Sequence, residues 1–513
     1  MARYVLVVSD SGPVSLRTGD GNVIHGSAGD VATSGSVELV AHGDIVMDGA
    51  AVLTSTGSNV RMETTGSDIH LGRVDAEAGA FSVVTSGGHL VDIGDTDVDI
   101  TTGELRLNVG TYAGSEDDPL EITVEEMSAV SGQGLFLAES DDLNIGEVGP
   151  ISVERVGADA TRTDISDSVQ SGLTSGGEVV LFLRNGTLSA SADVGMDTGD
   201  TNLTLYVSDS EIELLGPITV GTLELHGTAG NDQLSLKVPA VPVVSVEMMD
   251  GQDVVQVAAD SEPDMGSMID LGSDEDALIF LPSGEWNITG ENQGNINGSV
   301  GFSGVESVTA GAGDDTFAFS DGQGLNGHID AGNGEDTLDY SRYTSPVTIN
   351  RESDTATGLS SYTSVERVVG GSATDELIAT TEDEHTWRIT GQEAGVLEDV
   401  SGTFEFTGIE SLTGGDRQDD YIFDDGKIVT GVLDGRGGTD RINLNAYTTH
   451  NVIFMEGDGS GHIETDFGDA DLLNMEDAEG SNSSFHFDFT DLQASIDPDT
   501  VPDILATGNS ATV

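Results

Sequence analysis

The sequence predicts an all-β protein built as a right-handed parallel β-helix, or β-solenoid, with about 22 residues per coil. Three observations lead to this fold class. Apolar and polar residues alternate in short runs such as "SVELVAHGDIVMDG", glycines precede these runs at a near-constant interval, and 69 glycines with 11 prolines disfavour long helices. Each coil would bury its apolar face against the next coil, which builds one continuous core.

The charge of the chain limits its partners. The 513 residues include 92 acidic and 17 basic ones, for a formal net charge of −75. Such a charge excludes nucleic acid and anionic membranes as electrostatic partners and favours cations. The absence of cysteine removes disulfides and thiolate metal sites. An acidic surface with few lysines also suits high salt, so halophilic adaptation is a second explanation of the charge.

Residues 1–220 show the alternating strand pattern, with a glycine before each run. Gly35, Gly57, Gly79 and Gly103 each precede an alternating run, at spacings of 22, 22 and 24 residues. A period of this length with short strands and glycine turns is typical of solenoid coils. A disordered chain would not keep this register, so we predict an ordered first domain over this range.

Residues 221–480 keep a similar period with a different turn. Eight segments fit one template, in which an apolar residue, a glycine-containing turn and an aspartate precede an alternating strand. The aspartates of the template are Asp232, Asp253, Asp276, Asp315, Asp336, Asp375, Asp419 and Asp440. Several lie 21 or 23 residues apart, and the gaps of 39 and 44 residues are expected to hold two coils each. We therefore expect the aspartates to stack on one edge, about 4.8 Å apart.

A longer duplication overlies the turns. The segment "GFSGVESVTAG" at 301–311 recurs as "EFTGIESLTGG" at 405–415, a displacement of 104 residues. Trp286 and Trp387 occupy equivalent places in the two copies, where packing within the module is expected rather than sugar stacking. The template is lost from 481 onward, so 481–513 is expected to be a C-terminal cap or a flexible tail.

The closest turns resemble a known calcium-binding repeat. "AGAGDDTFA" (310–318) and "AGNGEDTLD" (331–339) are similar to the RTX, or haemolysin-type, nonapeptide, with alanine for its first glycine. The resemblance implies that Asp315 and Asp336 are calcium ligands. It also implies that the turn glycines are Gly311, Gly313, Gly332 and Gly334. The other six template aspartates keep only part of this glycine frame.

The first domain resembles a different group. Its texture of short strands and glycine turns over 1–220 is similar to the β-helical repeats of filamentous-haemagglutinin-type adhesins. That resemblance implies a secreted or cell-surface bacterial protein, of which this chain would be a segment. The N-terminal "MARYVLVVSDSG" has too short an apolar stretch for a signal peptide, and no run is long enough for a membrane helix.

Calcium suits the chemistry of the template. Calcium takes six to eight oxygen ligands, which glycine turns can supply as carbonyls and aspartates as carboxylates. The alternative is that glycine and aspartate simply make good turns. Stacked carboxylates without a cation would raise one another's pKa, and this cost favours a bound cation.

These observations predict a non-catalytic, calcium-binding structural or adhesive module, found outside the cell and able to meet surface glycans. The alternative is a carbohydrate-active β-helix enzyme, such as a polysaccharide lyase or a glycoside hydrolase. Paired carboxylates are expected by chance in so acidic a chain, and the basic residues are few and scattered. We therefore expect no catalytic residues and no cofactor other than Ca²⁺.

Overall fold

A computed structural model describes residues 12–26, 30–93, 97–238, 243–261, 266–448, 451–455, 460–475, 477–480 and 484–487. Within these residues the protein is all-β, and nearly all strands belong to one large, mostly parallel sheet. The described part contains no helix long and apolar enough to cross a membrane. The chain divides into two compact units, Met1–Pro282 with Ser299–Gly304 and Ser283–Gly298 with Val305–Val513, which are taken here one at a time.

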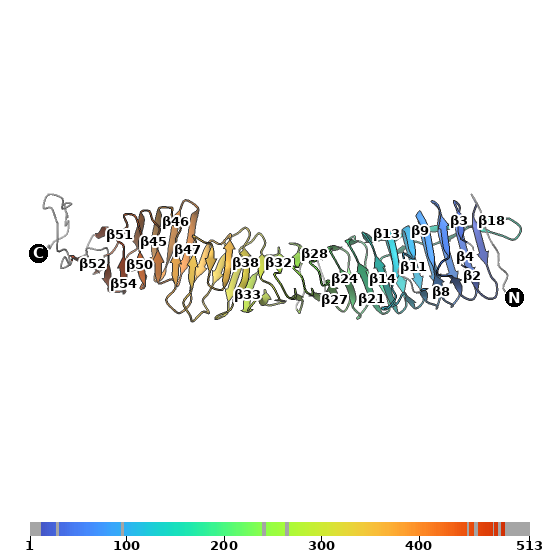
Figure 1. Ribbon diagram of the computed structural model, residues 1–513, viewed down its shortest axis with the longest axis horizontal. Coiled ribbons are helices and arrows are strands. Elements are labelled where there is room, and N and C mark those ends of the chain that lie inside the picture. The colour runs from blue at the N-terminus through green and yellow to red at the C-terminus, as the bar shows by residue number, and fades with distance from the viewer. Residues whose placement is uncertain are drawn as a thin grey trace. The chain divides into compact units, whose positions relative to one another are not determined.

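The first unit consists of parallel ladders, in which each strand pairs with a strand one repeat further along the chain (Figure 1). The first ladder contains β1 (Val14–Arg17), β4 (Val37–Ala41), β7 (Val60–Thr64), β9 (Arg73–Thr85), β11 (Ile100–Val109), β13 (Leu120–Ser131), β20 (Leu173–Ser175), β23 (Met196–Asp197) and β26 (Ile218–Thr219). The register steps by one repeat at a time, since Val14 pairs with Val37 and Val37 pairs with Val60.

The other ladders of this unit follow the same rule. The second contains β2 (Val23–His25), β5 (Ile45–Met47), β8 (Ile69–Leu71), β10 (Leu90–Asp92), β12 (Tyr112–Ala113), β14 (Gly134–Glu139), β21 (Glu178–Leu183), β24 (Leu203–Val207), β27 (Leu223–His226), β29 (Val244–Glu247), β31 (Met268–Asp270) and β35 (Val300–Ser303). The third contains β3 (Val31–Thr33), β6 (Val52–Ser55) and the first halves of β9, β11 and β13. The fourth contains β15 (Leu143–Ile145), β22 (Gly186–Ala190), β25 (Ser210–Leu214), β28 (Gln233–Lys237), β30 (Val254–Val257) and β32 (Ala277–Phe280).

Alternation along each strand places the core. In β4, Val37, Leu39 and Ala41 are buried and point to the interior, whereas Val40 on the other face is half-buried. The same inward positions recur in the next repeat as Val60 and Met62. Because every repeat adds its own row of apolar side chains, the core is continuous along the ladders.

The number of strands per repeat changes near residue 220. Among the described residues the first ladder ends at β26, and beyond it each repeat contributes one strand to the second ladder and one to the fourth. The boundary predicted at 220/221 lies at this change. The two compact units divide elsewhere, near residues 282–305. The domain boundary at 220/221 therefore stays a prediction, which rests on the change in turn sequence.

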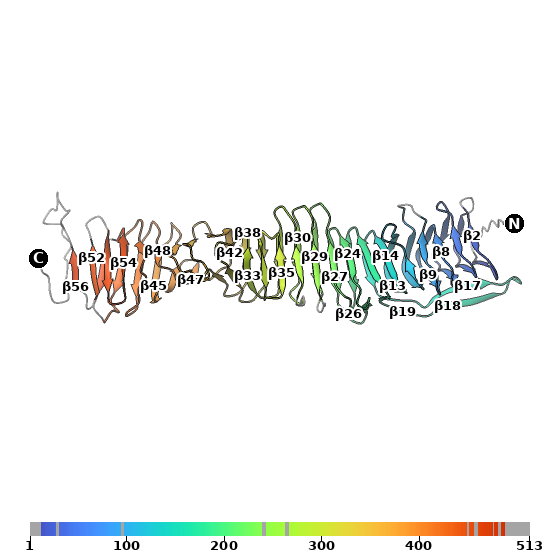
Figure 2. The same ribbon diagram turned by 90° about the horizontal axis from the view of Figure 1, so that it is seen from below.

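A hairpin interrupts the ladders of the first unit. β17 (Ile151–Val156) and β18 (Arg162–Asp167) form an antiparallel pair, with β16 (Glu147–Val148) and β19 (Gln170–Ser171) paired at its base. Figure 2 shows the hairpin lying across the strands of earlier repeats. It contacts β1, β4 and β9 through β17.

The second unit also consists of ladders. The fifth contains β33 (Glu285–Gly290), β37 (Thr316–Phe319), β39 (Thr337–Asp339), β43 (Arg367–Val369) and β47 (Gly402–Thr407), and the sixth contains β36 (Ser307–Thr309), β38 (Leu325–Asp330) and β42 (Leu359–Thr363). The seventh contains β40 (Thr348–Asn350), β44 (Glu376–Ile378), β48 (Ser411–Thr413), β50 (Val432–Asp434) and β54 (Gly468–Leu473). The eighth contains β45 (His385–Gly391), β49 (Asp419–Phe423), β51 (Arg441–Leu444) and β55 (Asp477–Gly480), and the ninth contains β52 (Asn451–Met455) and β56 (Ser484–Phe487).

Antiparallel strands connect a ladder that ends with a ladder that begins. β41 (Thr355–Ala356) lies between β40 and β42, β46 (Ala394–Asp399) between β45 and β47, and β53 (Gly461–Thr465) between β52 and β54. In each case the first strand starts a new ladder and the last one closes an old ladder. β34 (Gln293–Ile296) pairs with β33 in the same antiparallel way.

This arrangement corrects the expectation that the long gaps hold two coils each. In the gap from Asp336 to Asp375, Thr337 pairs with Arg367, thirty residues on, and Thr348 pairs with Glu376, so one longer repeat fills the space. The additional residues form the antiparallel strand. Composition could not reveal this, because alternation looks the same in parallel and antiparallel strands.

The two tryptophans are packing residues, as expected from the duplication. Trp286 and Trp387 are fully buried. Trp286 stacks on Phe317 at a centroid distance of 5.6 Å, and Trp387 stacks on Tyr421 at 5.8 Å. Of the predicted cap at 481–513, only β56 is described, and it pairs in parallel with β52; the rest lies outside the described residues.

Candidate functional site

The eight template aspartates share one environment. All are buried, with exposed fractions of 2% or less, although carboxylates are rarely so buried without partners. Each lies at the start of a strand; Asp419 is the first residue of β49, and Asp336 immediately precedes β39. They belong to four ladders rather than to one edge. Asp232, Asp253 and Asp276 lie on the fourth ladder, Asp315 and Asp336 on the fifth, Asp375 on the seventh, and Asp419 and Asp440 on the eighth.

The single edge expected from the spacing is therefore wrong. Each antiparallel strand shifts the chain from one ladder to another, so aspartates on either side of a long gap are not stacked. Stacking holds only across the short spacings, such as that from Asp315 to Asp336.

The carboxylates hold the backbone of the neighbouring repeat. Oδ1 of Asp253 accepts a hydrogen bond from the backbone N–H of Asp232 at 2.8 Å, and Oδ1 of Asp336 accepts one from Asp315 at 2.7 Å. The backbone N–H of Asp419 donates in the same way to Asp440 at 2.9 Å. The backbone carbonyls of Asp232 and Asp315 in turn accept from the next strand, from the N–H groups of Val254 and Thr337, both at 2.9 Å. The aspartates therefore complete the backbone pairing where each strand begins.

At the first strand of a ladder, the group that faces the aspartate is not the N–H of another template aspartate. The N–H of Gly284, just before β33, donates to Oδ1 of Asp315 at 2.6 Å, and the N–H of Val347, just before β40, donates to Asp375 at 2.7 Å. At the start of the eighth ladder, Nδ1 of His385 lies 2.6 Å from Oδ1 of Asp419, and both side chains are fully buried. Nε2 of His385 lies 3.1 Å from Oγ1 of Thr380.

Two glutamates act like the aspartates and were not predicted. Oε2 of Glu366 accepts from the N–H of Asp336 at 2.9 Å, and Oε2 of Glu410 accepts from the N–H of Asp375 at 2.7 Å. Glu410 lies in the repeated "GIESL" segment, and Glu366 lies in the similar "SVERV". The recurrence of Val/Ile-Glu before a strand was the available signal, and the longer side chain is used where the repeat is longer.

The turn glycines are explained by contact with the same carboxylates. The N–H of Gly371 donates to Oδ2 of Asp375 at 2.5 Å, and the N–H of Gly415 donates to Oδ2 of Asp419 at 2.8 Å. The preceding glycine has no room for a side chain, because a Cβ on Gly414 would lie 2.0 Å from Oδ2 of Asp419. The adjacent glycines of the template are thus required by the buried aspartate.

The four glycines singled out by the resemblance lie in stacked turns. A Cβ on Gly332 would lie 2.0 Å from the carbonyl oxygen of Gly311, and one on Gly334 would lie 2.4 Å from that of Gly313. The carbonyl of Gly311 accepts a hydrogen bond from the N–H of Asn333 at 3.1 Å. Close backbone approach between repeats explains Gly332 and Gly334 without reference to a ligand.

Burial makes four of the ladder carboxylates less acidic. Desolvation raises the pKa of Asp336 to about 6, and the charges of Asp315 and Glu366 add to this effect. Burial also raises the pKa of Asp253, Asp315 and Asp375, against hydrogen bonds from the backbone that lower it. Ionising these four buried carboxylates is therefore unfavourable in the folded chain.

These contacts bear on calcium. Oδ1 of each ladder aspartate quoted above already accepts a hydrogen bond. Within the described part of the chain, no ladder aspartate belongs to a group of three acidic or histidine side chains close enough to share an ion. The six to eight oxygens that calcium prefers are not gathered at one ladder position by acidic side chains. Calcium binding by the twelve residues of the template stays a prediction.

Another acidic group lies in the first unit. Carboxylate oxygens of Asp92, Asp99 and Glu121 lie within 4.8 Å of one another. Burial, followed by the charge of Asp92, raises the pKa of Asp99 to about 9, and burial also raises the pKa of Glu121. Oδ2 of Asp99 accepts from the N–H of Glu121 at 3.0 Å. This group could share a proton or hold a cation, and the sequence template did not include it.

No protein family model, no curated protein and no solved structure matches this chain.

Proposed function

We propose that the chain is a non-catalytic structural module of a large secreted or cell-surface bacterial protein, in which the parallel ladders are the faces of a right-handed β-solenoid. The supporting observation is the use made of the template aspartates. Their carboxylates accept backbone N–H groups of neighbouring repeats, and this is a means of holding repeats together. The adhesive role and the location outside the cell rest on the sequence resemblances.

The solenoid is supported by the one-repeat register of every parallel ladder. Val14, Val37 and Val60 follow one another on the first ladder. On the second ladder, Leu223 pairs with Val244, and Leu225 pairs with Val246. Small-angle scattering on the full chain tests the solenoid. We expect the profile of a rod whose length corresponds to about 4.8 Å for each repeat. A compact globular profile would contradict the solenoid.

Calcium is part of the proposal as a stiffening cation. At Asp315 and Asp336 it would bind through Oδ2 atoms and turn carbonyls, because Oδ1 of each accepts a backbone N–H. A cation there would offset the cost of ionising buried carboxylates such as Asp336. The net charge of −75 also favours cations in general, so a test must separate specific binding from screening.

The experiment is thermal unfolding of the full chain, followed by circular dichroism, in millimolar CaCl₂ and in NaCl of matched ionic strength. Specific binding predicts a higher Tm with calcium only, by the mass-action effect of a ligand on the folded state. The double variant Asp315→Asn/Asp336→Asn keeps both Oδ1 acceptors and removes both charges, so it should fold and lose the calcium effect. An equal calcium shift in this variant would sink the ladder site while leaving the structural role intact.

The carbohydrate-active enzyme remains the alternative. Glycoside hydrolysis needs two carboxyl groups on either side of a bound sugar, one of them protonated. The nearest arrangement is the group of Asp92, Asp99 and Glu121, but Asp92 and Asp99 are buried, which separates them from a substrate. Release of reducing sugar from a polysaccharide panel, lost in Asp99→Asn, would favour the enzyme over the structural module.

A further inference from the structure

The hairpin of β17 and β18 is an insertion with a closed base. It leaves the ladders after Gly146 and returns at Gly172, and the N–H of Gly172 donates to the carbonyl of Gly146 at 2.9 Å. The N–H of Gly146 donates to Met127, so both ends remain part of the backbone pairing. The ladders therefore do not need the hairpin for their own continuity, and its conformation is explained by what it touches.

The hairpin crosses one repeat after another, back toward the N-terminal end of the unit (Figure 2). Near its base, Nε2 of Gln170 donates to the carbonyl of Leu107 at 2.7 Å, on β11. Further out, Nδ2 of Asn59, just before β7, donates to the carbonyl of Ser152 at 2.9 Å. Near the far end, the N–H of Glu154 donates to Oγ of Ser36 at 2.8 Å, a contact between residues 118 apart in sequence.

Side chains of successive repeats form the row that the hairpin covers. Glu38, Arg61, Ser82 and Arg106 pair with one another in this order on β4, β7, β9 and β11. All four are buried although they lie on the outer face of the sheet. Nε of Arg106 donates to the carbonyl of Ser168 at 3.1 Å.

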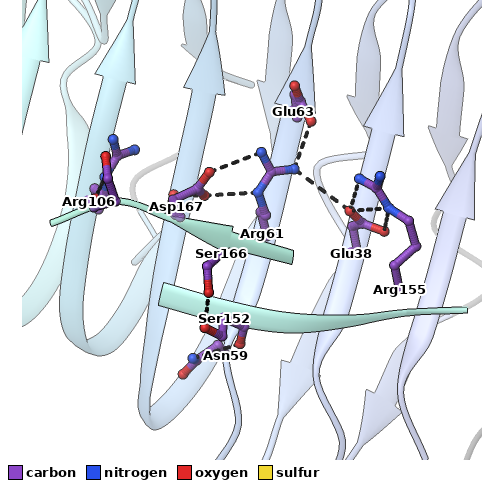
Figure 3. Close-up of polar contacts among 11 residues, drawn as sticks. Glu38, Asn59, Arg61, Glu63, Arg106, Ser152, Arg155, Ser166 and Asp167 are labelled. Atoms are coloured by element: carbon purple, nitrogen blue, oxygen red, sulfur yellow. Dashed lines mark hydrogen bonds and ion pairs between the residues drawn. The ribbon is translucent and has the colours of Figure 1, made fainter. Parts of the chain in front are cut away.

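The central contact joins two repeats to the hairpin at once. Arg61 donates to both oxygens of Asp167, at 2.9 Å from Nε and 3.0 Å from Nη2 (Figure 3). Oγ of Ser82 donates to Oδ2 of the same carboxylate at 2.7 Å. Nη1 of Arg61 also donates to Glu63 at 2.8 Å. Paired hydrogen bonds between arginine and a carboxylate are directional and strong when they are buried.

A second ion pair fastens the far end. Nε of Arg155 donates to both oxygens of Glu38, at 3.0 and 2.9 Å, and Glu38 is fully buried (Figure 3). Oγ of Ser15, on β1, donates to the same carboxylate at 2.8 Å. Glu38, on β4, thus connects the hairpin both to β4 and, through Ser15, to β1.

Repeat arrays have a general weakness at their ends. Each repeat contacts only its neighbours, so a terminal repeat can open without disturbing the rest. A hairpin bonded to β4, β7, β9 and β11 removes this independence. We propose that the hairpin is a clamp that makes the repeats from β4 to β11 open as one cooperative unit and prevents stepwise unfolding from the N-terminal side.

Hydrogen exchange followed by mass spectrometry on the full chain tests the clamp. The first variant replaces residues 147–171 by two glycines, which the contact between Gly146 and Gly172 allows. In the intact chain we expect similar exchange rates for the amides of β4, β7 and β11. Without the hairpin we expect exchange at least tenfold faster in β4, a smaller increase in β7 and none in β21, beyond the hairpin.

Point variants test the same idea without a deletion. Arg155→Ala removes the far ion pair, and we expect at least tenfold faster exchange in β4. Arg162→Ala is the matched control, because Arg162 lies on the same hairpin and, among the described residues, its side chain bonds to Glu154, also on the hairpin, at 3.2 Å. Its exchange in β4 should stay within twofold of the intact chain.

The double variant Arg155→Ala/Glu38→Gln separates the clamp from a simple penalty for an unpaired buried charge. The clamp predicts that fast exchange in β4 persists, because the hairpin is still detached at that end. Recovery of slow exchange in the double variant, or an exchange profile of β4, β7 and β11 that the deletion leaves unchanged, would overturn the proposal. A variant that does not fold would be recognised by fast exchange in β21.

Discussion

Neighbouring repeats are held together by different contacts under the hairpin and in the second unit. In the second unit a buried aspartate holds the backbone of an adjacent repeat, as Asp336 does for Asp315. Under the hairpin, by contrast, Arg155 from more than a hundred residues along the chain bonds to Glu38 on the outer face of the sheet. The difference teaches that repeats can be joined by many short-range contacts or by a few long-range ones. Disruption should stay local in the first case and spread over several repeats in the second.

The largest effect is expected from loss of a ladder carboxylate. Asp336→Ala leaves the N–H of Asp315 buried without its acceptor. The free energy of unfolding of the second unit should fall by about 3 kcal/mol, the scale of a hydrogen bond to a charged group plus a buried unsatisfied donor. Denaturant unfolding followed by circular dichroism measures it, and hydrogen exchange should place the change within the fifth ladder.

Two controls sharpen this prediction. Asp336→Asn keeps an acceptor at Oδ1 and should retain most of the stability. Asp314→Ala removes an exposed neighbour whose Oδ1 accepts from the N–H of Glu335 at 3.0 Å, and it should cost much less. Equal losses for Asp314→Ala and Asp336→Ala would contradict the ladder as the source of stability.

A turn glycine should give the next largest effect. Gly414→Ala places a methyl group 2.0 Å from Oδ2 of Asp419 and 3.1 Å from the hydroxyl of Tyr421. Overpacking of this kind costs about 1–3 kcal/mol. Gly437→Ala, whose Cβ would meet its nearest atom at 3.5 Å, is the matched control and should be nearly neutral in the same unfolding experiment.

The two regions should respond oppositely to pH. Asp336 has a folded pKa of about 6 against an ordinary value of 3.8, so the folded state keeps a proton that the unfolded state has released. Stability of the second unit should therefore fall as pH rises from about 4 to 6. This part of the pH dependence should disappear in Asp336→Asn.

At the hairpin the sign is reversed. Burial alone would raise the pKa of Glu38 and Asp167, but hydrogen bonds from Arg155 and Ser15, and from Arg61 and Ser82, outweigh it and lower both values. The clamp is thus strongest above the ordinary values of 4.5 and 3.8 and weakens as pH falls below them. Hydrogen-exchange protection measured from pH 3 to 8 should be similar in β4, β7 and β11 at neutral pH, and β4 should lose protection before β11 only at the acidic end.

The smallest effect is expected from an exposed ion pair. Arg388 donates to Glu398 at 2.9 Å between two strands of an antiparallel connection, with side chains 48% and 41% exposed. Arg388→Ala should change the free energy of unfolding by less than about 1 kcal/mol. A loss as large as that for Asp336→Ala would mean that surface pairs, rather than buried ladders, join the repeats.

The all-β class, the repeat of the strands, the eight turn aspartates and the packing of the two tryptophans could all be predicted from the sequence. These follow from periodicity, because alternation and glycine spacing report directly on local backbone geometry. Calcium binding, adhesion and location outside the cell remain predictions of the resemblances and of the charge.

The tertiary structure alone decided which aspartates meet. Asp336 and Asp375 have the same turn but lie on different ladders, because an antiparallel strand such as β41 moves the chain from one ladder to the next. It also decided that Asp336 is buried and that Glu366 completes its ladder. The hairpin could not be predicted at all, since Arg155 and Glu38 are 117 residues apart and only folding brings these opposite charges together.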